Sequence, residues 1–164
     1  MNRIRIVRFI SALFLALAFL SGCSSTNDYR RVAGDCSYTD DEIAAIRDKA
    51  EDGDANSQYE LGEVFFAGTC VRLNNSAGMD WMRKSAEQGD ARAQSILGWG
   101  YSMGAYGVTY NAELAKKWTL KAAEQGDIRS QKQLAYAYLA GRWGLDKDIK
   151  KSVYWYQKLS LIHI

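Results

Sequence analysis

Glu87-Gln88-Gly89-Asp90-Ala91 is the segment that decides the fold, because close copies of it occur before and after it. Glu51-Asp52-Gly53-Asp54-Ala55 is the earlier copy and Glu124-Gln125-Gly126-Asp127-Ile128 is the later one, so the three glycines lie 36 and 37 residues apart. Three tryptophans recur every 37 residues: Trp81, Trp118 and Trp155. Repeats of this length are typical of solenoids, in which each unit buries its apolar face against its neighbours.

Each repeat predicts two helices. Small and apolar residues recur three and four positions apart after each copy, which places them on one helix face. In the first unit these residues are Ala55, Gln58, Leu61, Gly62 and Phe65. Glycines that suit a left-handed helix end follow at Gly68, Gly104 and Gly141. Good N-cap residues for a second helix come next, at Asn74, Asn111 and Asp148.

This pattern resembles the Sel-one-like repeat family, a relative of the tetratricopeptide repeats, from about Asp40 to Leu159. The resemblance rests on the Gly-Asp-Ala starts, on Leu-Gly in the first helix, on Gly107-Val108, on the aromatic residues Phe65, Tyr101 and Tyr138, and on Trp followed by Lys-Ala-Ala-Glu-Gln-Gly. It implies an all-α, right-handed superhelical solenoid of antiparallel helix pairs, with about three repeats in a domain over residues 39–164. Residues 40–50 resemble a lone second helix, and Thr39 and Glu42 have capping-box spacing.

The N-terminus predicts a secretory signal. Arg3, Arg5 and Arg8 precede an apolar run over residues 9–20, which is too short to span a bilayer as a helix. Leu20-Ser21-Gly22-Cys23 resembles the lipobox of bacterial lipoproteins. We therefore expect residues 1–22 to be a lipoprotein signal peptide and Cys23 to be the lipid attachment site. Residues 23–38 would form the lipidated N-terminus and a polar tether; the alternatives are a membrane helix and an unmodified thiol.

The residue after Cys23 is Ser24. Since Asp at this position favours retention in the inner membrane of Gram-negative bacteria, the resemblance implies a protein of the cell envelope that is lipid-anchored in the outer membrane and faces the periplasm. Removal of the three signal arginines leaves 18 basic and 19 acidic residues, from 21 and 19. A chain near −1 with no basic patch does not favour a nucleic-acid partner.

The residues do not predict an active site. His163 is the only histidine, so a histidine-based acid–base pair or metal cluster cannot be assembled. The glycines recur at helix boundaries rather than in a phosphate-binding loop. We expect no enzyme activity, no cofactor or metal, and no small-molecule substrate; a paired-carboxylate hydrolase is the alternative.

Two further features predict sites. Cys36 and Cys70 lie at the ends of helices expected to pack against each other, so an exported chain would join them in a disulfide, with two free thiols as the alternative.

Trp99 and Tyr136 share one position of the first helix, where the first unit has Glu63. Tyr106 and Trp143 share one loop position. These four aromatics predict a partner-binding strip, unless they only fill gaps between repeats.

The sequence therefore predicts a protein–protein interaction adaptor, whose partner is an envelope component or a secreted effector. Relatives with this repeat include immunity proteins that neutralise phospholipase effectors, so an immunity protein is one version of this hypothesis. An envelope or cell-wall enzyme, or an enzyme accessory factor, is the alternative.

We predict that Cys23→Ser leaves the protein without lipid and outside the outer-membrane fraction, because the thiol is the acceptor in a lipobox. Metabolic labelling with a fatty-acid probe, followed by membrane fractionation, tests this. Equal labelling of the wild-type and Cys23→Ser proteins would refute the prediction.

Overall fold

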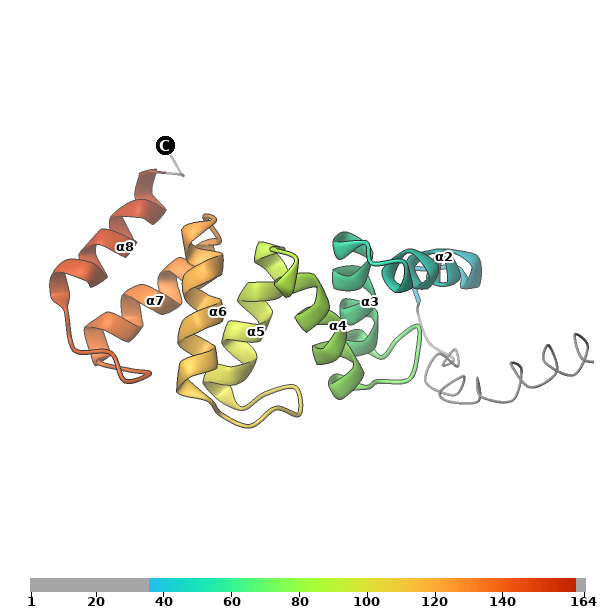
Figure 1. Cartoon of the computed structure of the whole chain (residues 1–164), viewed down its shortest axis with the longest axis horizontal. Helices are drawn as coiled ribbons and strands as arrows, with labels where there is room; N and C mark the ends of the chain where they lie inside the picture. The colour runs from blue at the N-terminus through green and yellow to red at the C-terminus, as the bar shows by residue number, and fades with distance from the viewer. Residues whose placement is uncertain (1–35, 162–164) are drawn as a thin grey trace, which may run out of the picture. The chain divides into compact units, whose positions relative to one another are not determined.

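The computed structural model describes residues 36–161, with side chains as far as Leu159. This range contains seven α-helices and no β-strand (Figure 1). The helices are α2 (Asp40–Glu51), α3 (Ala55–Ala67), α4 (Asn75–Glu87), α5 (Ala91–Met103), α6 (Ala112–Glu124), α7 (Ile128–Ala140) and α8 (Ile149–Leu161). The predicted signal peptide, Cys23 and His163 lie outside the described residues.

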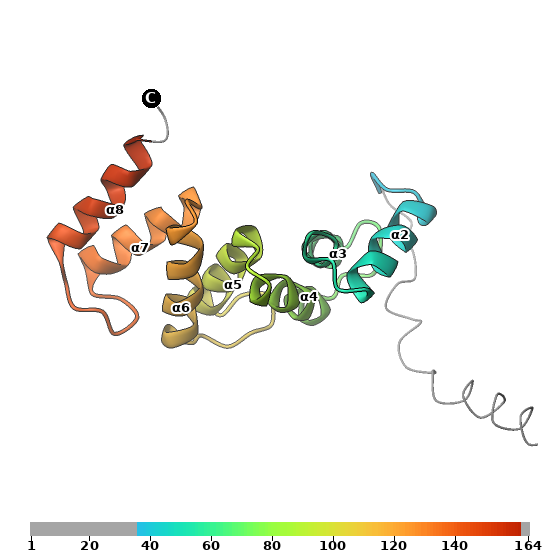
Figure 2. The ribbon, with the colours of Figure 1, turned by 45° about the horizontal axis from the view of Figure 1, so that its top comes forward.

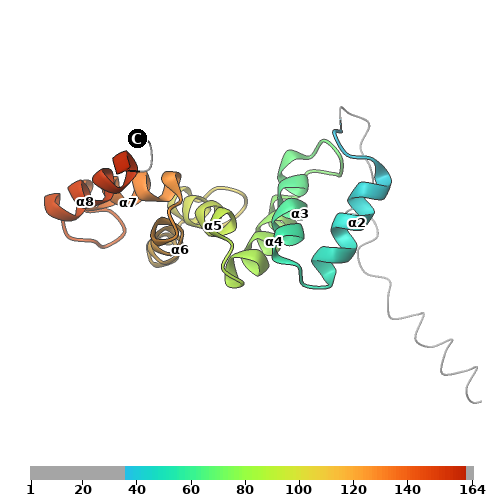
Figure 3. The ribbon, with the colours of Figure 1, turned by 90° about the horizontal axis from the view of Figure 1, so that it is seen from above.

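Helix pairs follow one another along this part of the chain. Each helix packs against the helices before and after it in the sequence, and α5 also contacts α7. Figure 2 shows the pairs α3–α4, α5–α6 and α7–α8 in order, and Figure 3 shows α2 beside α3 from above. The predicted all-α helical-repeat fold is confirmed. We call α3, α5 and α7 the first helices and α4, α6 and α8 the second helices; α2 is an additional helix of the second kind.

The helix boundaries follow from repeated capping residues. Asp54 accepts a hydrogen bond from the Ser57 N–H at 2.7 Å, and Asp127 accepts one from the Ser130 N–H at 2.7 Å. Each first helix ends at a glycine in the left-handed region, for example Gly68 at φ 63°. The second helices begin at the predicted caps: Asn74, Asn111 and Asp148. Thr39 and Glu42 form the predicted capping box of α2.

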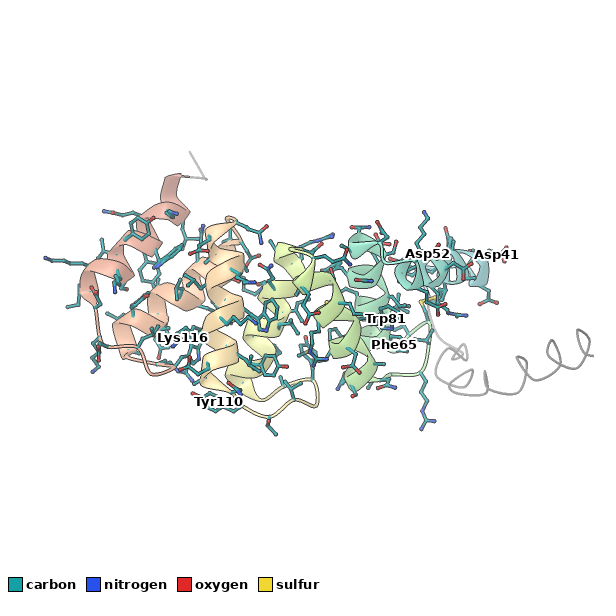
Figure 4. The ribbon with its side chains drawn as sticks, in the orientation of Figure 1. Asp41, Asp52, Phe65, Trp81, Tyr110 and Lys116 are labelled. Carbon is teal, nitrogen blue, oxygen red and sulfur yellow. A yellow bond between two sulfur atoms is a disulfide. The ribbon has the colours of Figure 1, made fainter. Side chains whose placement is uncertain are left out.

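The core lies between the first and second helices of each unit. The three repeating tryptophans are at most 9% exposed, and Phe65 on α3 is 1% exposed; Phe65 and Trp81 are labelled in Figure 4. Small residues let the helices approach closely: a Cβ atom on Gly62 would lie 2.8 Å from Cε of Met82. Tyr101, at the position of Phe65 in the second unit, is also buried, whereas Tyr138 in the third unit is half-buried.

Buried glutamines connect each first helix to the second helix that precedes it. The Nε2 amide of Gln58 donates to the Ala50 carbonyl at 3.0 Å. Gln94 donates to Ala86 at 3.1 Å in the same way, and Gln131 donates to Ala123 at 3.1 Å. Each of these carbonyls also accepts the backbone N–H of the glycine three residues later, so the glutamine amide is its second donor.

A second glutamine completes two of these connections. Gln88 Nε2 donates to Gln58 Oε1 at 2.8 Å and to the Gly53 carbonyl at 2.9 Å. Gln125 repeats this arrangement with Gln94 and Gly89, at 2.8 and 3.0 Å. We call this repeated set of bonds the glutamine interlock.

The interlock is incomplete in the third unit. The sequence register assigns Ile162 to the position of Gln88 and Gln125, and isoleucine has no side-chain donor. In agreement with this, Gln131 Oε1 is buried and accepts no hydrogen bond within the described part of the chain.

Cys36 and Cys70 are joined by a disulfide, as predicted, and their Cα atoms lie 4.7 Å apart. The bond connects the segment before α2 to the loop after α3. It therefore links the additional helix to the first complete unit.

Candidate functional site

Equivalent positions of the first helices lie side by side, as expected for stacked repeats. Arg92 on α5 reaches back to α3, where its guanidinium donates to Asn56 Oδ1 at 2.8 Å and lies 4.1 Å from the ring centre of Tyr59. Arg129 holds the matching position on α7. We call the surface shared by the three first helices the A face.

A hollow of about 280 Å³ opens on the A face. Its lining residues are Ile96, Trp99, Tyr106 and Arg129. The rings of Trp99 and Tyr106 lie 5.3 Å apart at a tilt of 59°, and Tyr106 stacks on Phe66 of the preceding unit at 4.2 Å. The hollow thus has aromatic walls that two neighbouring units hold in place.

An unusual backbone conformation positions Tyr106. Its φ angle is 56°, in the left-handed region that non-glycine residues adopt at an energetic cost. The stack on Phe66 and the contact with Trp99 keep the ring in this position. Trp143, at the matching loop position of the third unit, has a φ angle of 57°.

One charged residue, Arg129, lines the hollow. Arg129 is exposed and forms no hydrogen bond or ion pair within the described residues, whereas Arg92 is held by Asp90 at 2.6 Å. Burial raises the pKa of Glu63, and the positive charges of Arg129 and Arg92 partly oppose this rise. The guanidinium of Arg129 is therefore available to a carboxylate of a bound molecule.

The structure brings together two of the four predicted strip residues, Trp99 and Tyr106. Tyr136 is 50% exposed on α7, with the Arg142 guanidinium 5.9 Å from its ring centre. Trp143 is only 5% exposed and belongs to the hydrophobic core, so its prediction as a surface anchor was wrong. The position of Phe66 holds the small Ser102 in the next unit, which leaves room for the Trp143 indole to turn inward.

Sequence reasoning missed two lining residues, Ile96 and Arg129. The sequence does contain a sign of Arg129: an arginine follows directly after Gly-Asp-Ala in the second unit (Arg92) and after Gly-Asp-Ile in the third (Arg129). Ile96 has no such signal, since Glu60 and Gln133 hold its position in the other units.

Among residues 36–161, no three His, Cys, Asp or Glu side chains are grouped in a way that could hold a metal ion. In the same range, no helix has the length and apolar character needed to cross a membrane. The hollow on the A face is the candidate site that combines two of the predicted strip aromatics with a charged group, Arg129.

Stacked helix pairs with repeated caps define a helical-repeat protein. The Sel1 repeat matches three consecutive segments, residues 55–90, 91–127 and 128–161. The chain belongs to the Sel1 repeat family.

Two solved structures are similar to this chain. A Sel1 repeat protein from Oxalobacter formigenes is 31% identical, with a TM-score of 0.69, and the match covers 74% of this chain and 90% of that one. A protective antigen of uropathogenic Escherichia coli with an SLR fold is 26% identical, with a TM-score of 0.42, over 74% of this chain and 33% of that one. No curated protein matches the chain.

We predict that Trp143→Ala destabilises the fold about as much as Trp118→Ala, by about 3–5 kcal/mol, because both remove a buried indole. Trp99→Ala should cost less, because Trp99 is only half-buried. Urea unfolding followed by circular dichroism measures all three. A Trp99→Ala protein that is as unstable as the Trp118→Ala protein would show that Trp99 is a core residue and not part of a binding surface.

Proposed function

We propose that this chain is a lipid-anchored adaptor of the bacterial cell envelope that binds another protein through the hollow on the A face. The observation that carries this proposal is the combination of Trp99, Tyr106 and Ile96 with the guanidinium of Arg129, which has no hydrogen-bond or ion-pair partner among the described residues. Aromatic residues and arginine are the most frequent energetic anchors of protein interfaces.

The chemistry of the hollow indicates what the partner presents. A space of about 280 Å³ accommodates a single large side chain rather than a whole element of secondary structure. Its aromatic walls favour an apolar or aromatic group. Arg129, at the rim, favours a carboxylate next to that group, because a guanidinium binds a carboxylate through two parallel hydrogen bonds.

Membership of the Sel1 repeat family supports a role in protein binding. The basic start, the apolar run and the Leu20-Ser21-Gly22-Cys23 sequence support the envelope location and the lipid anchor. In this proposal the acyl chains on Cys23 hold the repeat domain at the outer membrane, and the A face binds its partner in the periplasm.

An immunity protein is one version of this function. Its partner would be an effector that reaches the periplasm, whereas the partner of an assembly adaptor would be a resident envelope protein. The two versions use the same hollow and differ in the origin of the partner. An adjacent toxin gene would favour the first, and a secretion or polysaccharide operon would favour the second.

Affinity capture with purified variants tests the proposal. The wild-type protein, Trp99→Ala, Arg129→Glu and a control, Tyr156→Ala on α8, are used as baits in envelope extracts of the source bacterium. We expect the wild type and Tyr156→Ala to retain the same partner, and Trp99→Ala to weaken its binding by about 2 kcal/mol or more, as is usual for an interface anchor. Arg129→Glu should reduce binding because it places a negative charge next to the partner carboxylate.

The control separates a specific site from a general loss of binding. Tyr156 is 44% exposed and lies on a second helix, away from the A face. Equal capture of the partner by the wild type, Trp99→Ala and Arg129→Glu would contradict the proposed site. Loss of the partner from the Tyr156→Ala bait alone would place the interface on α8 instead.

A further inference from the structure

The additional helix α2 exposes a face that the other second helices bury. With Gly53, Gly89 and Gly126 aligned, Ala45 and Ile46 occupy two positions that are well covered in α4 and α6. The residues at those positions are Trp81 and Met82 in α4, and Trp118 and Thr119 in α6; all four are at most 9% exposed. Ala45, in contrast, is exposed and Ile46 is half-buried. The difference arises because α4 and α6 each pack against the first helix of their own unit, and no first helix precedes α2 among residues 36–161.

A groove of about 1030 Å³ runs along this face of α2 and reaches the first turns of α3. One wall includes Ile46 and Lys49 of α2, and the other includes Asn56 and Glu60 of α3. Asn56 occupies the position in α3 that Arg92 occupies in α5, and Arg92 contacts the preceding first helix. In the other units, residues equivalent to Ile46 and Asn56 contact a first helix, so both walls present surfaces that are covered by a helix elsewhere in the protein.

The groove is acidic where an entering helix would meet it. Asp52, at the end of α2 (Figure 4), lines the groove and stands at the interlock position of Gln88 and Gln125. Those glutamines donate to a glutamine of their own first helix, but an aspartate carboxylate only accepts. A helix in the groove must therefore carry a donor at this point, and a basic side chain is the donor that also matches the charge.

The same register places two further requirements on the entering helix. Ile46 in α2 is equivalent to Met82 in α4, and Met82 lies against Gly62 of α3. Gly62 is four residues after Gln58, so the residue of the entering helix that faces Ile46 comes four positions after the one that faces Asp52. Glu42 in α2 is equivalent to Gly78 in α4, and Gly78 lies against Phe66 of α3. Phe66 is eight residues after Gln58, so the residue that faces Glu42 comes eight positions after the one that faces Asp52. A small residue opposite Ile46 and a second basic residue opposite Glu42 would thus complement the groove, on one stripe of the helix.

We propose that this groove binds an amphipathic helix of a partner protein in which a basic residue is followed by glycine or alanine four positions later and by a second basic residue eight positions later. The helix takes the place of a first helix before α2, in the helix-in-groove mode of recognition. This site is separate from the hollow on the A face, and the proposal does not depend on the proposed function.

A peptide based on the protein's own third first helix tests the proposal. The probe has the sequence of residues 127–141 with Gln131→Arg and Leu139→Arg, and its natural Ala135 supplies the small residue. Fluorescence anisotropy of the labelled peptide is measured against the chain from residue 24 onward. We expect saturable binding at one site, and we expect no binding of a second peptide that carries Gln131→Glu and Leu139→Glu instead.

Matched variants of the protein locate the binding site. Asp52→Lys should weaken binding on the order of tenfold, because it opposes like charges. Asp146→Lys makes the same charge change at an exposed residue of the loop before α8, and binding should be unchanged. Trp99→Ala should also leave peptide binding unchanged, which separates this groove from the A face. Thermal melting of each variant confirms that it is folded.

Three results would overturn the proposal: no binding of the arginine probe, equal binding by the Asp52→Lys and Asp146→Lys proteins, or binding only after residues 24–35 are removed. The last result would mean that the protein's own preceding segment, and not a partner, occupies the groove.

Discussion

The glutamine interlock is the interaction on which the regular stacking of the units depends. A second helix ends with carbonyl groups that no N–H of the same helix can reach. Each of the carbonyls of Ala50, Ala86 and Ala123 accepts the backbone N–H of the glycine three residues later. Gln58, Gln94 and Gln131 each give one of these carbonyls a second donor from the next first helix, and each does so from a buried position. Because a buried polar group without a partner costs about 1–3 kcal/mol, a change in the offset between units would be penalised at every connection.

A constant offset between units is also what creates a binding surface. It places Arg92 over Tyr59 of the preceding unit and lets Tyr106 stack on Phe66 across the same boundary. The hollow beside Trp99 exists only because α5 and α7 remain side by side. The constant offset set by the interlock therefore underlies the geometry of the A face.

Most of the fold could be predicted from the sequence, because the repeated glycines, caps and tryptophans each have a direct physical role. The disulfide could be predicted because the helix order brings Cys36 and Cys70 to the same end of a pair. Tyr106 and Trp143 show the limit of this reasoning: they share a loop position and a backbone conformation, but only Trp143 is buried. Side-chain direction there depends on the size of a neighbour in another unit, Phe66 or Ser102.

The interlock could not be predicted either. A glutamine recurs at the position of Gln58 on an otherwise apolar face, but the sequence does not show which carbonyls a glutamine reaches.

The free energy of unfolding of the Gln125→Leu protein tests the role of the interlock most directly. This substitution leaves Gln94 Oε1 and the Gly89 carbonyl without their donor, while Glu124→Leu changes the neighbouring exposed residue as a control. Urea unfolding should show a loss of about 1 kcal/mol for Gln125→Leu, the usual net contribution of a hydrogen bond that is not fully buried. The control should remain within about 0.5 kcal/mol of the wild type. Equal stability of the two variants would contradict the claim that the glutamines hold the units in register.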